Sequence, residues 1–334
     1  MPIVSETVRP GITPTRTFER ELLRSVQVCF IVVWFGELPR WMVYFFRSCE
    51  ENPGFHWRIF TDADCDVETP ANVFLHKFNQ SALEELASAR FGSRYRFSDG
   101  YKLCDLKPTY GDLFSDYLKD YAFWGYTDLD LVYGDISSFI DQSILSGFDV
   151  ITASKRILVG HFTLIRNNED MCRLYSKCDG YLAKLQSLSY EVFDENDFGV
   201  LVKAKATEGQ LRLFEESIQT DDCIIWWAGR SHFLILWLQG KLTDLVVFRR
   251  LSYFHFIQSK HRPYFRISRT AKVPGNFFID IHGIHPIEGI WSGWLFLVSF
   301  ARTFFFTIPW YLKSILKTVL SKNTRLRIRK IMRR

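Results

Sequence analysis

The sequence predicts one α/β domain that is followed by an apolar C-terminal helix. Strand-like apolar runs alternate with segments of helical composition, which is the pattern of a layered α/β domain. The 334 residues are 47% hydrophobic and 24% charged, so the chain has ample material for a buried core. Residues 290–312 are almost wholly apolar. Because the sequence has neither an internal repeat nor a low-complexity linker, we expect a single main domain.

The first expected strand is the run from Val26 to Phe35, which is rich in Val, Ile and Phe. Gly36 and Pro39 close this run, as is typical of a buried strand that ends in a loop. Further strands are expected at residues 57–60, 121–133, 148–153 and 160–165, and a strand, turn and strand at 237–242. Helices are expected at residues 40–50, 81–90, 103–119 and 168–188.

The net charge of +5 is unevenly distributed along the chain. Ten Lys or Arg residues and no Asp or Glu follow Glu288, so the preceding residues carry a net charge of −5. A uniformly basic surface for nucleic acid is therefore not expected. The seven cysteines are scattered without a C-x-x-C pair, and residues 1–24 contain no apolar run. These two features favour a reducing compartment and argue against a secretory signal.

Two aspartates, Asp128 and Asp130, interrupt the apolar segment 121–133. On an extended chain, side chains at i and i+2 point to the same side, and Leu129 between them would face the core. Ionised carboxylates in an apolar strand are costly unless a cation or hydrogen-bond donors satisfy them. We therefore predict a site for Mn²⁺ or Mg²⁺, which prefer oxygen ligands. The alternative is a strand that leaves the core with both acids solvated.

The Asp128-Leu129-Asp130 segment resembles the D-x-D motif of GT-A glycosyltransferases, in which the acids hold a divalent cation against a nucleotide-sugar diphosphate. Residues 26–262 are similar to a poorly characterised bacterial group of GT-A-like proteins. The other segments that carry the resemblance are Trp34-Phe35-Gly36-Glu37-Leu38-Pro39, Phe60-Thr61-Asp62, Tyr101-Lys102-Leu103-Cys104-Asp105-Leu106-Lys107-Pro108, Trp124-Gly125 and Tyr133-Gly134-Asp135.

This resemblance implies a GT-A-like domain with a Rossmann-like mixed sheet flanked by helices. It divides the chain into an N-terminal arm (1–24), a catalytic domain (25–285) and a membrane-associating apolar helix with a basic tail (286–334). Within the catalytic domain, residues 25–135 would form the nucleotide-binding half. Residues 136–285 would form the half that binds the sugar and the acceptor.

His255 and Lys260 resemble a C-terminal pair of retaining GT-A families, in which the His ligates the metal and the Lys contacts the diphosphate. The Gly that usually lies between the two is replaced here by Gln or Ser. The resemblance implies that His255 joins the two aspartates as a metal ligand and that Lys260 binds the donor. A core histidine is the alternative for His255, and His282 with His285 is a competing ligand pair or a turn.

Two further lysines, Lys102 and Lys107, precede the D-x-D segment and would neutralise phosphate charge on the donor. Asp105 is expected beside them at the donor. At i, i+3 on a helix, Lys102 and Asp105 would alternatively form a local ion pair. From the position of the first two strands in the resemblance, Trp34 and Asp62 are also expected to bind the donor.

A second acidic cluster, Asp194, Glu195 and Asp197, follows the expected helix 168–188. Its position resembles the segment that contacts the donor sugar in retaining families, which implies a catalytic role for these carboxylates. Asp194 and Glu195 would hydrogen-bond sugar hydroxyls. In an inverting enzyme one of them would be the general base that deprotonates the acceptor hydroxyl. An acidic helix cap or a solvated loop is the alternative.

The apolar segment 290–312 is long enough to span a bilayer, and Arg302 is its only charge. An arginine near the centre of a span costs about 2.5–3.5 kcal/mol. Polar residues fall on one helical stripe opposite Trp, Phe and Leu, which favours a helix in the membrane interface. The basic residues of 322–334 would be attracted to anionic lipid. We expect peripheral attachment to the cytoplasmic face of the membrane, with a span and a core or oligomer helix as alternatives.

Together, these features predict a metal-dependent glycosyltransferase of bacterial surface polysaccharide or glycolipid synthesis. The expected donor is a UDP- or GDP-linked sugar, and the expected acceptor is a hydroxyl of a saccharide or a lipid-linked molecule. One alternative is a phosphotransferase of the haloacid dehalogenase type, whose D-x-D-x-[TV] signature matches residues 128–132, although that motif normally opens the first strand of its domain. The other is a non-catalytic, membrane-bound carbohydrate-binding protein.

Overall fold

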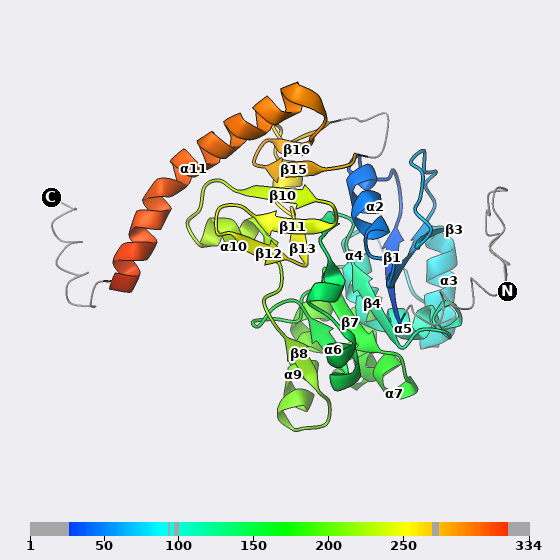
Figure 1. Ribbon diagram of the computed structural model, residues 1–334. Coiled ribbons are helices and arrows are strands. Elements are labelled where there is room, and N and C mark those ends of the chain that lie inside the picture. Colours follow the sequence, from blue (N-terminus) through cyan, green and yellow to red (C-terminus); the bar gives the residue numbers. More distant parts are fainter. Residues whose placement is uncertain (1–26, 93, 97–99, 269–273, 320–334) are drawn as a thin grey trace. The chain divides into compact units, whose positions relative to one another are not determined.

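The computed structural model describes residues 27–92, 94–96, 100–268 and 274–319, the last five of these by their backbone alone (Figure 1). The described chain divides into two compact units: unit 1 ends at Gln219, and unit 2 begins at Thr220. This boundary falls within the half of the chain that we expected to bind the sugar and the acceptor. The predicted arm, residues 1–24, and the basic segment 322–334 lie outside the described residues.

The strands of unit 1 are β1 (Val28–Trp34), β2 (Phe55–Thr61), β3 (Val73–Lys77), β4 (Phe123–Thr127), β5 (Leu131–Tyr133), β6 (Val150–Thr152), β7 (Phe162–Arg166) and β8 (Leu213–Glu215). In the described part of this unit, seven of them form one sheet in the order β3-β2-β1-β4-β7-β6-β8. β1 pairs in parallel with β2 and β4, whereas β7 is antiparallel to both β4 and β6. The sheet is therefore mixed, and the predicted α/β class is confirmed.

The helices of unit 1 are α2 (Met42–Glu50), α3 (Gln80–Phe91), α4 (Lys102–Leu106), α5 (Tyr110–Leu113), α6 (Gln142–Gly147), α7 (Glu169–Cys172), α8 (Tyr181–Gln186) and α9 (Phe198–Thr207), with short turns η1 (Lys107–Thr109), η2 (Ser115–Tyr117), η3 (Ile136–Ser138), η4 (Leu174–Lys177) and η5 (Phe193–Asp197). The helices expected at 103–119 and 168–188 were wrong as continuous elements. Pro108 lies at the start of η1, and Gly180 adopts φ 66° before α8.

Both faces of the unit 1 sheet are buried, which explains the continuous apolar run of β1. On one face, Cys29, Ile31 and Val33 belong to a core cluster with residues of α3, α5 and α9. On the other face, the Phe30 ring stacks on Trp57, with 5.6 Å between the ring centroids, and α2 packs against β5. The alternation of side chains along β1 thus contributes to the packing on both faces of the sheet.

The elements of unit 2 are β9 (Thr220–Asp221), α10 (Asp222–Trp227), β10 (Leu234–Leu238), β11 (Lys241–Asp244), β12 (Arg249–Leu251), β13 (Tyr253–His255), η6 (Ser259–His261), β14 (Arg266–Ile267), β15 (Phe277–Asp280), β16 (Gly283–Pro286) and α11 (Gly289–Val319). Six strands of its described part form a sheet in the order β12-β11-β10-β15-β16-β14. β10 and β11 confirm the expected strand, turn and strand. Gln239 (φ 47°) and Gly240 (φ 77°) make the two-residue turn between them.

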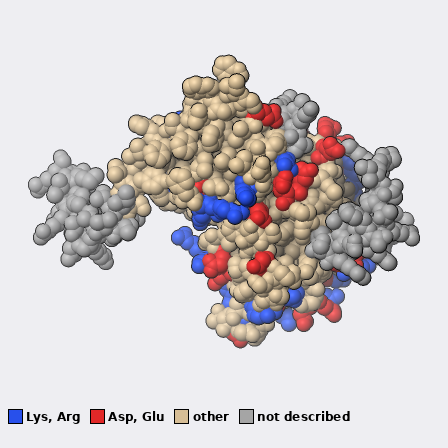
Figure 2. Space-filling view, in the orientation of Figure 1, with Lys and Arg blue, Asp and Glu red and all other residues tan. Residues whose placement is uncertain are grey.

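The helix α11 is long and apolar enough to cross a membrane by length and composition. A surface helix of a soluble protein buries apolar side chains and exposes polar ones. In α11 this distribution is reversed, because the polar residues Ser299, Thr303 and Thr307 are buried on its inner face. The surface over α11 is almost free of charged side chains in the view of Figure 2. The large apolar side chains that α11 exposes are Ile290, Trp291, Trp294, Leu295, Leu297, Val298, Phe300, Phe304, Phe305, Phe306, Ile308 and Leu312.

Two interactions fasten the inner face of α11 to the sheet of unit 2. The Ser299 hydroxyl donates to Asp280 Oδ2 at 2.5 Å, and the Arg302 guanidinium donates to the same oxygen at 3.0 Å. Farther along the helix, Trp310 Nε1 donates to the carbonyl of Ala228 at 2.8 Å. Ser299, Arg302 and Thr303 of the predicted polar stripe therefore lie on the side of α11 that packs against protein, whereas Lys313 is exposed.

Candidate functional site

The Asp128-Leu129-Asp130 segment forms a bend between β4 and β5. The apolar run predicted as one broken strand ends at Thr127 and resumes at Leu131. Leu129 is 1% exposed and faces the core, as expected. The Asp128 and Asp130 side chains each offer a carboxylate oxygen, and these oxygens lie within 4.8 Å of one another. The bend therefore brings the two acids together although they do not lie on a strand.

The bend lies where the strand order of the unit 1 sheet reverses direction. From β1 the chain adds β2 and β3 on one side, and then places β4 on the other side of β1. In open α/β sheets, ligands bind outside the carboxyl ends of the strands at such a switch point. The end of β1 at Trp34 and the residue after β2, Asp62, lie at this same edge. Three of the predicted site residues, Trp34, Asp62 and Asp128, thus share one edge of the sheet.

Hydrogen bonds fix the loops at this edge. Asp62 Oδ1 accepts from the backbone N–H of Gly36 at 2.8 Å, and the Trp34 indole donates to the carbonyl of Glu37 at 3.1 Å. The Trp41 indole donates to the carbonyl of Leu129 at 2.7 Å and so holds the bend of the D-x-D segment. Trp41 was not among the predicted site residues, because its hydrogen-bond partner is 88 residues away and no local pattern indicates it.

Lys107 contacts the D-x-D segment directly. Its ammonium group donates to Asp128 Oδ1 at 2.5 Å and to the carbonyl of Gly160 at 2.8 Å. Burial acts to lower the pKa of Lys107, but Asp128, with Cys104 and Asp194, outweighs this effect, so the pKa is well above its usual value. Lys107 is therefore a charged, buried group that orients one carboxylate of the pair.

Lys102 and Asp105 form the local ion pair that the spacing offered as an alternative. Both side chains are fully buried, and Lys102 Nζ donates to Asp105 Oδ2 at 2.9 Å. Lys102 also donates to the carbonyl oxygens of Lys184 and Ser189. Asp105 accepts from the backbone N–H of Phe193 at 2.8 Å. The pair therefore positions the segment that leads into Asp194, while contact of either residue with a donor stays a prediction.

The second acidic cluster begins in η5, a π-helical turn that runs directly into α9. Val192, which precedes the turn, has φ 56°, a strained conformation for a β-branched residue. Asp194 is 2% exposed, and its Oδ1 has no hydrogen-bond partner among the residues that the structure describes. Burial raises the pKa of Asp194 to about 7, against the opposing effect of the Lys107 ammonium. π-helical turns and backbone strain of this kind are frequent at functional sites.

Gly160 connects this acidic cluster to Lys107. Its N–H donates to Glu195 Oε1 at 2.9 Å, and its carbonyl accepts from Lys107. A Cβ at this position would overlap the carboxylate of Asp194, so the close approach requires glycine. From the sequence, Gly160 was predicted only as the first residue of a strand. Asp197, the third predicted carboxylate, instead forms an ion pair with Lys184.

Unit 2 contains the remaining predicted residues. His255 ends β13, is buried, and lies opposite Asp221 in the parallel pairing of β13 with β9. Lys260 is half-buried in η6. In the competing pair, His285 Nε2 lies 3.3 Å from Asp280 Oδ1. His282 follows β15 in the expected turn, and its N–H donates to the same oxygen at 2.7 Å.

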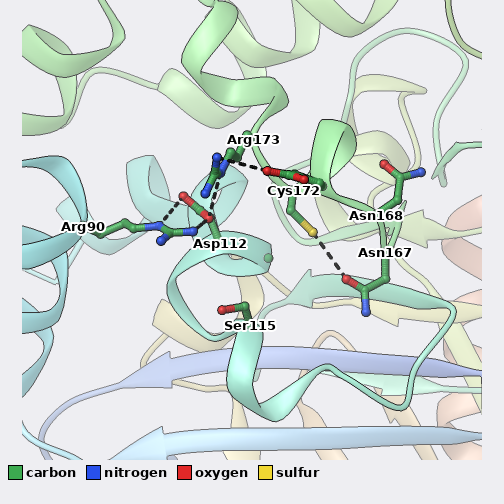
Figure 3. A pocket seen from close by; sticks show the side chains of 9 residues that line it. Arg90, Asp112, Ser115, Asn167, Asn168, Cys172 and Arg173 are labelled. Atoms are coloured by element: carbon green, nitrogen blue, oxygen red, sulfur yellow. Dashed lines mark hydrogen bonds and ion pairs between the residues drawn. The ribbon is translucent and has the colours of Figure 1, made fainter. Parts of the chain in front are cut away.

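A separate hollow of about 260 Å³ lies in unit 1 (Figure 3). Its residue Asn167 follows the end of β7, which pairs with the start of β4, so the hollow is at the sheet edge opposite Asp128. Arg90 and Arg173 point toward Asp112, which both contact. Tyr175 donates a further hydrogen bond to Asp112 at 2.8 Å. Glu169 also lines the hollow and pairs with Arg173 at 3.3 Å, so two arginines balance two carboxylates and the hollow has no excess charge for a ligand.

One protein family matches most of the chain. Residues 30–288 match a family of unknown function (DUF6625). The match begins in β1, includes both acidic clusters and His255, and ends directly before α11. No curated protein matches the chain at a significant level. Because the match extends over most of its length, the chain belongs to this family of unknown function.

Proposed function

We propose that the protein is a metal-dependent glycosyltransferase of the GT-A type, which transfers a sugar from a UDP- or GDP-linked donor to an acceptor hydroxyl. The observation that carries this proposal is the pair of carboxylates, Asp128 and Asp130, at the carboxyl end of β4. This position is where open α/β sheets bind nucleotides.

The residues at the bend fit a divalent cation. Carboxylate oxygens are the ligands that Mg²⁺ and Mn²⁺ prefer, and Lys107 occupies only Oδ1 of Asp128. A charged partner that orients a metal-ligating carboxylate is a common feature of such sites. From the sequence pattern, His255 is proposed as a further ligand. When bound, the cation would neutralise the negative charge of the donor diphosphate.

The remaining residues have roles that follow from their own chemistry. Lys107 is a fixed positive charge beside Asp128, and Lys260 is proposed to contact the diphosphate. Asp194 is partly protonated near neutral pH, so it can either donate to or accept from a sugar hydroxyl. Glu195 is held by the N–H of Gly160. The strain at Val192 is consistent with a precisely held sugar contact.

We further propose that the protein acts at the cytoplasmic face of a bacterial membrane, in surface polysaccharide or glycolipid synthesis. The exposed apolar side of α11 supports attachment to lipid. The basic residues of segment 322–334 would add attraction to anionic lipid, which also favours the cytoplasmic side.

The test is a turnover assay on a panel of UDP- and GDP-sugars, with Mn²⁺ and with EDTA. We expect metal-dependent release of the nucleoside diphosphate, and a decrease of roughly 10²–10³-fold in Asp130→Ala. Asp116→Asn is the matched control, because Asp116 is exposed and pairs only locally with Lys119. Turnover without metal, or full activity of Asp130→Ala, would contradict the proposal. Hydrolysis of phosphate esters in the same assay would favour a phosphotransferase, and donor binding without turnover would favour a carbohydrate-binding protein.

A further inference from the structure

A hollow of about 380 Å³ lies within unit 2, apart from the residues assigned above to the donor and the metal. This volume is within the range of small-molecule sites, which is about 300–1,000 Å³. The residues that line it are Trp226, Ser231, Ser259, Arg262, Tyr264 and Ile281. Two aromatic side chains, two serine hydroxyl groups and one guanidinium therefore surround a single space.

The guanidinium of Arg262 gives the hollow its charge. It lies over the ring of Trp226, 5.0 Å from the centroid, at the distance of a cation–π contact. Within the described part of the chain, no carboxylate pairs with Arg262. A planar, uncompensated guanidinium suits the oxygens of a phosphate group. The faces of Trp226 and Tyr264 suit the C–H-rich face of a sugar ring.

Two walls of the hollow are attached to α11. Trp226 is two residues before Ala228, whose carbonyl accepts the hydrogen bond from Trp310. On the same segment, the ring of His232 stacks on Phe306, with 4.5 Å between the centroids. On the other wall, Ile281 follows Asp280, which binds Ser299 and Arg302 of α11. The hollow and the exposed apolar side of the helix therefore belong to one connected piece of unit 2.

The packing of α11 determines how it can meet a bilayer. A spanning helix is surrounded by lipid or by other spanning segments, but the inner side of α11 rests on a sheet with buried Ser299, Thr303 and Thr307. Its outer side exposes Trp291 at 86% and Phe305 at 67%. A helix with this arrangement lies in the plane of the membrane surface with its apolar side toward the acyl chains. Because the hollow belongs to the same piece of unit 2 as this helix, we expect it near the level of the lipid headgroups.

We propose that this hollow binds the phosphate-bearing head of a membrane lipid that carries the acceptor, while the hydrocarbon chain of that lipid stays in the bilayer. The identification of the lipid as the acceptor depends on the proposed glycosyltransferase function. The binding of a phosphate-bearing lipid head depends only on the hollow and on α11. Arg262 would hold the phosphate, and Trp226 and Tyr264 would contact the adjoining sugar or the start of the chain.

Flotation of the full-length protein with two kinds of vesicle tests the proposal. One kind contains phosphatidylcholine with a polyprenyl phosphate, and the other contains phosphatidylcholine with a long-chain fatty acid, an anionic lipid without phosphate, at equal surface charge. We expect Arg262→Ala to weaken binding to the polyprenyl phosphate vesicles about 10-fold, as loss of a charge-assisted hydrogen bond predicts. Trp226→Ala should weaken it in the same direction, because Arg262 loses the ring over which it lies. Binding to the fatty-acid vesicles should change little, because their anionic lipid has no phosphate and α11 is intact.

Lys241→Ala is the matched control, since it removes one positive charge from an exposed position on β11. Arg262→Lys keeps the charge but loses the planar fork, so an intermediate affinity is expected. Equal weakening on both kinds of vesicle would overturn the proposal in favour of general electrostatic attraction. Full competition by inorganic phosphate at the affinity of the lipid would show a site for the free anion.

Metal-dependent hydrolysis of the donor separates this proposal from the proposed function. If Arg262→Ala lowers transfer to a lipid acceptor and leaves donor hydrolysis unchanged, the hollow is the acceptor site. If the unaltered protein hydrolyses no donor but still prefers polyprenyl phosphate vesicles, the glycosyltransferase function fails and the lipid site stands. Wild-type lipid preference in both Arg262→Ala and Trp226→Ala would overturn the lipid site itself.

Discussion

Asp194 of unit 1 and Asp280 of unit 2 are both 2% exposed, yet their surroundings differ. Asp280 accepts hydrogen bonds from Ser299, Arg302 and the N–H of His282. Burial acts to raise its pKa, but hydrogen bonds, above all from His285, lower the pKa to about 2. Asp194 has one oxygen without a partner among the described residues, and burial raises its pKa to about 7.

The difference separates a structural carboxylate from a candidate functional one. The donors around Asp280 compensate its burial, and two of them, Ser299 and Arg302, come from the helix that packs on the sheet. Asp194 lacks such compensation, so its ionised form destabilises the folded state. A buried acid with an unsatisfied oxygen and a raised pKa is a frequent property of functional sites.

The largest effect is expected from removing the Asp280 carboxylate. Asp280→Ala leaves Arg302 and Ser299 without their acceptor, and breaking a buried pair in this way costs about 3–5 kcal/mol. Urea unfolding should show this decrease in the free energy of unfolding. Asp64→Ala is the control, since Asp64 is 92% exposed in its pair with Lys77 and should contribute little. Equal stability of the Asp280 variant and the wild type would remove the contrast between the two aspartates.

The second effect is a pH dependence that Asp194 creates. Its pKa is higher in the folded state, so the folded protein binds more protons and loses stability as the pH rises from about 4 to about 7. Asp194→Asn should remove this loss, and at pH 8 the variant should be more stable by roughly 2–4 kcal/mol. Thermal or urea unfolding of both proteins between pH 5 and 8 measures it. Parallel stability curves would show that Asp194 has an ordinary pKa.

A smaller effect is expected where the backbone approaches Asp194. Gly160→Ala adds a Cβ that overlaps the Asp194 carboxylate, and such overpacking costs about 1–3 kcal/mol. Gly147→Ala is the matched control, because a Cβ there meets no atom within 4 Å. Comparing the two variants in the Asp194→Asn background shows whether the clash depends on the charge of that carboxylate. A Gly160→Ala protein as stable as Gly147→Ala would contradict the close approach.

The smallest effect is expected from titrating Asp280 near neutrality. Its lowered pKa means that the carboxylate contributes stability fully above about pH 4 and loses it as the pH falls toward 2. The stability difference between the wild type and Asp280→Asn should therefore be constant from pH 5 to 8. It should shrink below pH 4, as acid unfolding curves would reveal. A difference that changes between pH 5 and 8 would point to the neighbouring histidines instead.

The sequence predicted the elements that depend on local pattern. The apolar run of β1, the helix α2, the β10–β11 turn and the apolar segment 290–312 within α11 are fixed by residue type and spacing. The helices expected at 103–119 and 168–188 were wrong as continuous elements. Short 3-10 turns interrupt both, with Pro108 in one of these turns and the left-handed Gly180 directly before α8. The expected strand containing Asp128 and Asp130 is a bend.

The sequence predicted the carboxylates of the candidate site but not the residues that hold them in place. Asp128 and Asp130 stand out because ionised carboxylates are costly in an apolar strand. Asp194 was expected from the position of its acidic cluster in the family resemblance. Gly160 has no Cβ, which allows its backbone to lie close to Asp194. The indole N–H of Trp41 donates to the carbonyl of Leu129 in a distant segment. No local pattern reveals such contacts, since they exist only after the sheet has assembled.

By itself, the sequence determined the α/β class, the paired aspartates and an apolar C-terminal helix, because periodicity and charge placement are local properties of the chain. The tertiary structure decided that Asp280, and not Asp194, has hydrogen-bond donors for its buried carboxylate, and which side of α11 packs against protein. Both outcomes depend on hydrogen-bond partners that are far apart in the sequence. Only packing brings a donor to Asp280 and leaves an oxygen of Asp194 without one in the described chain.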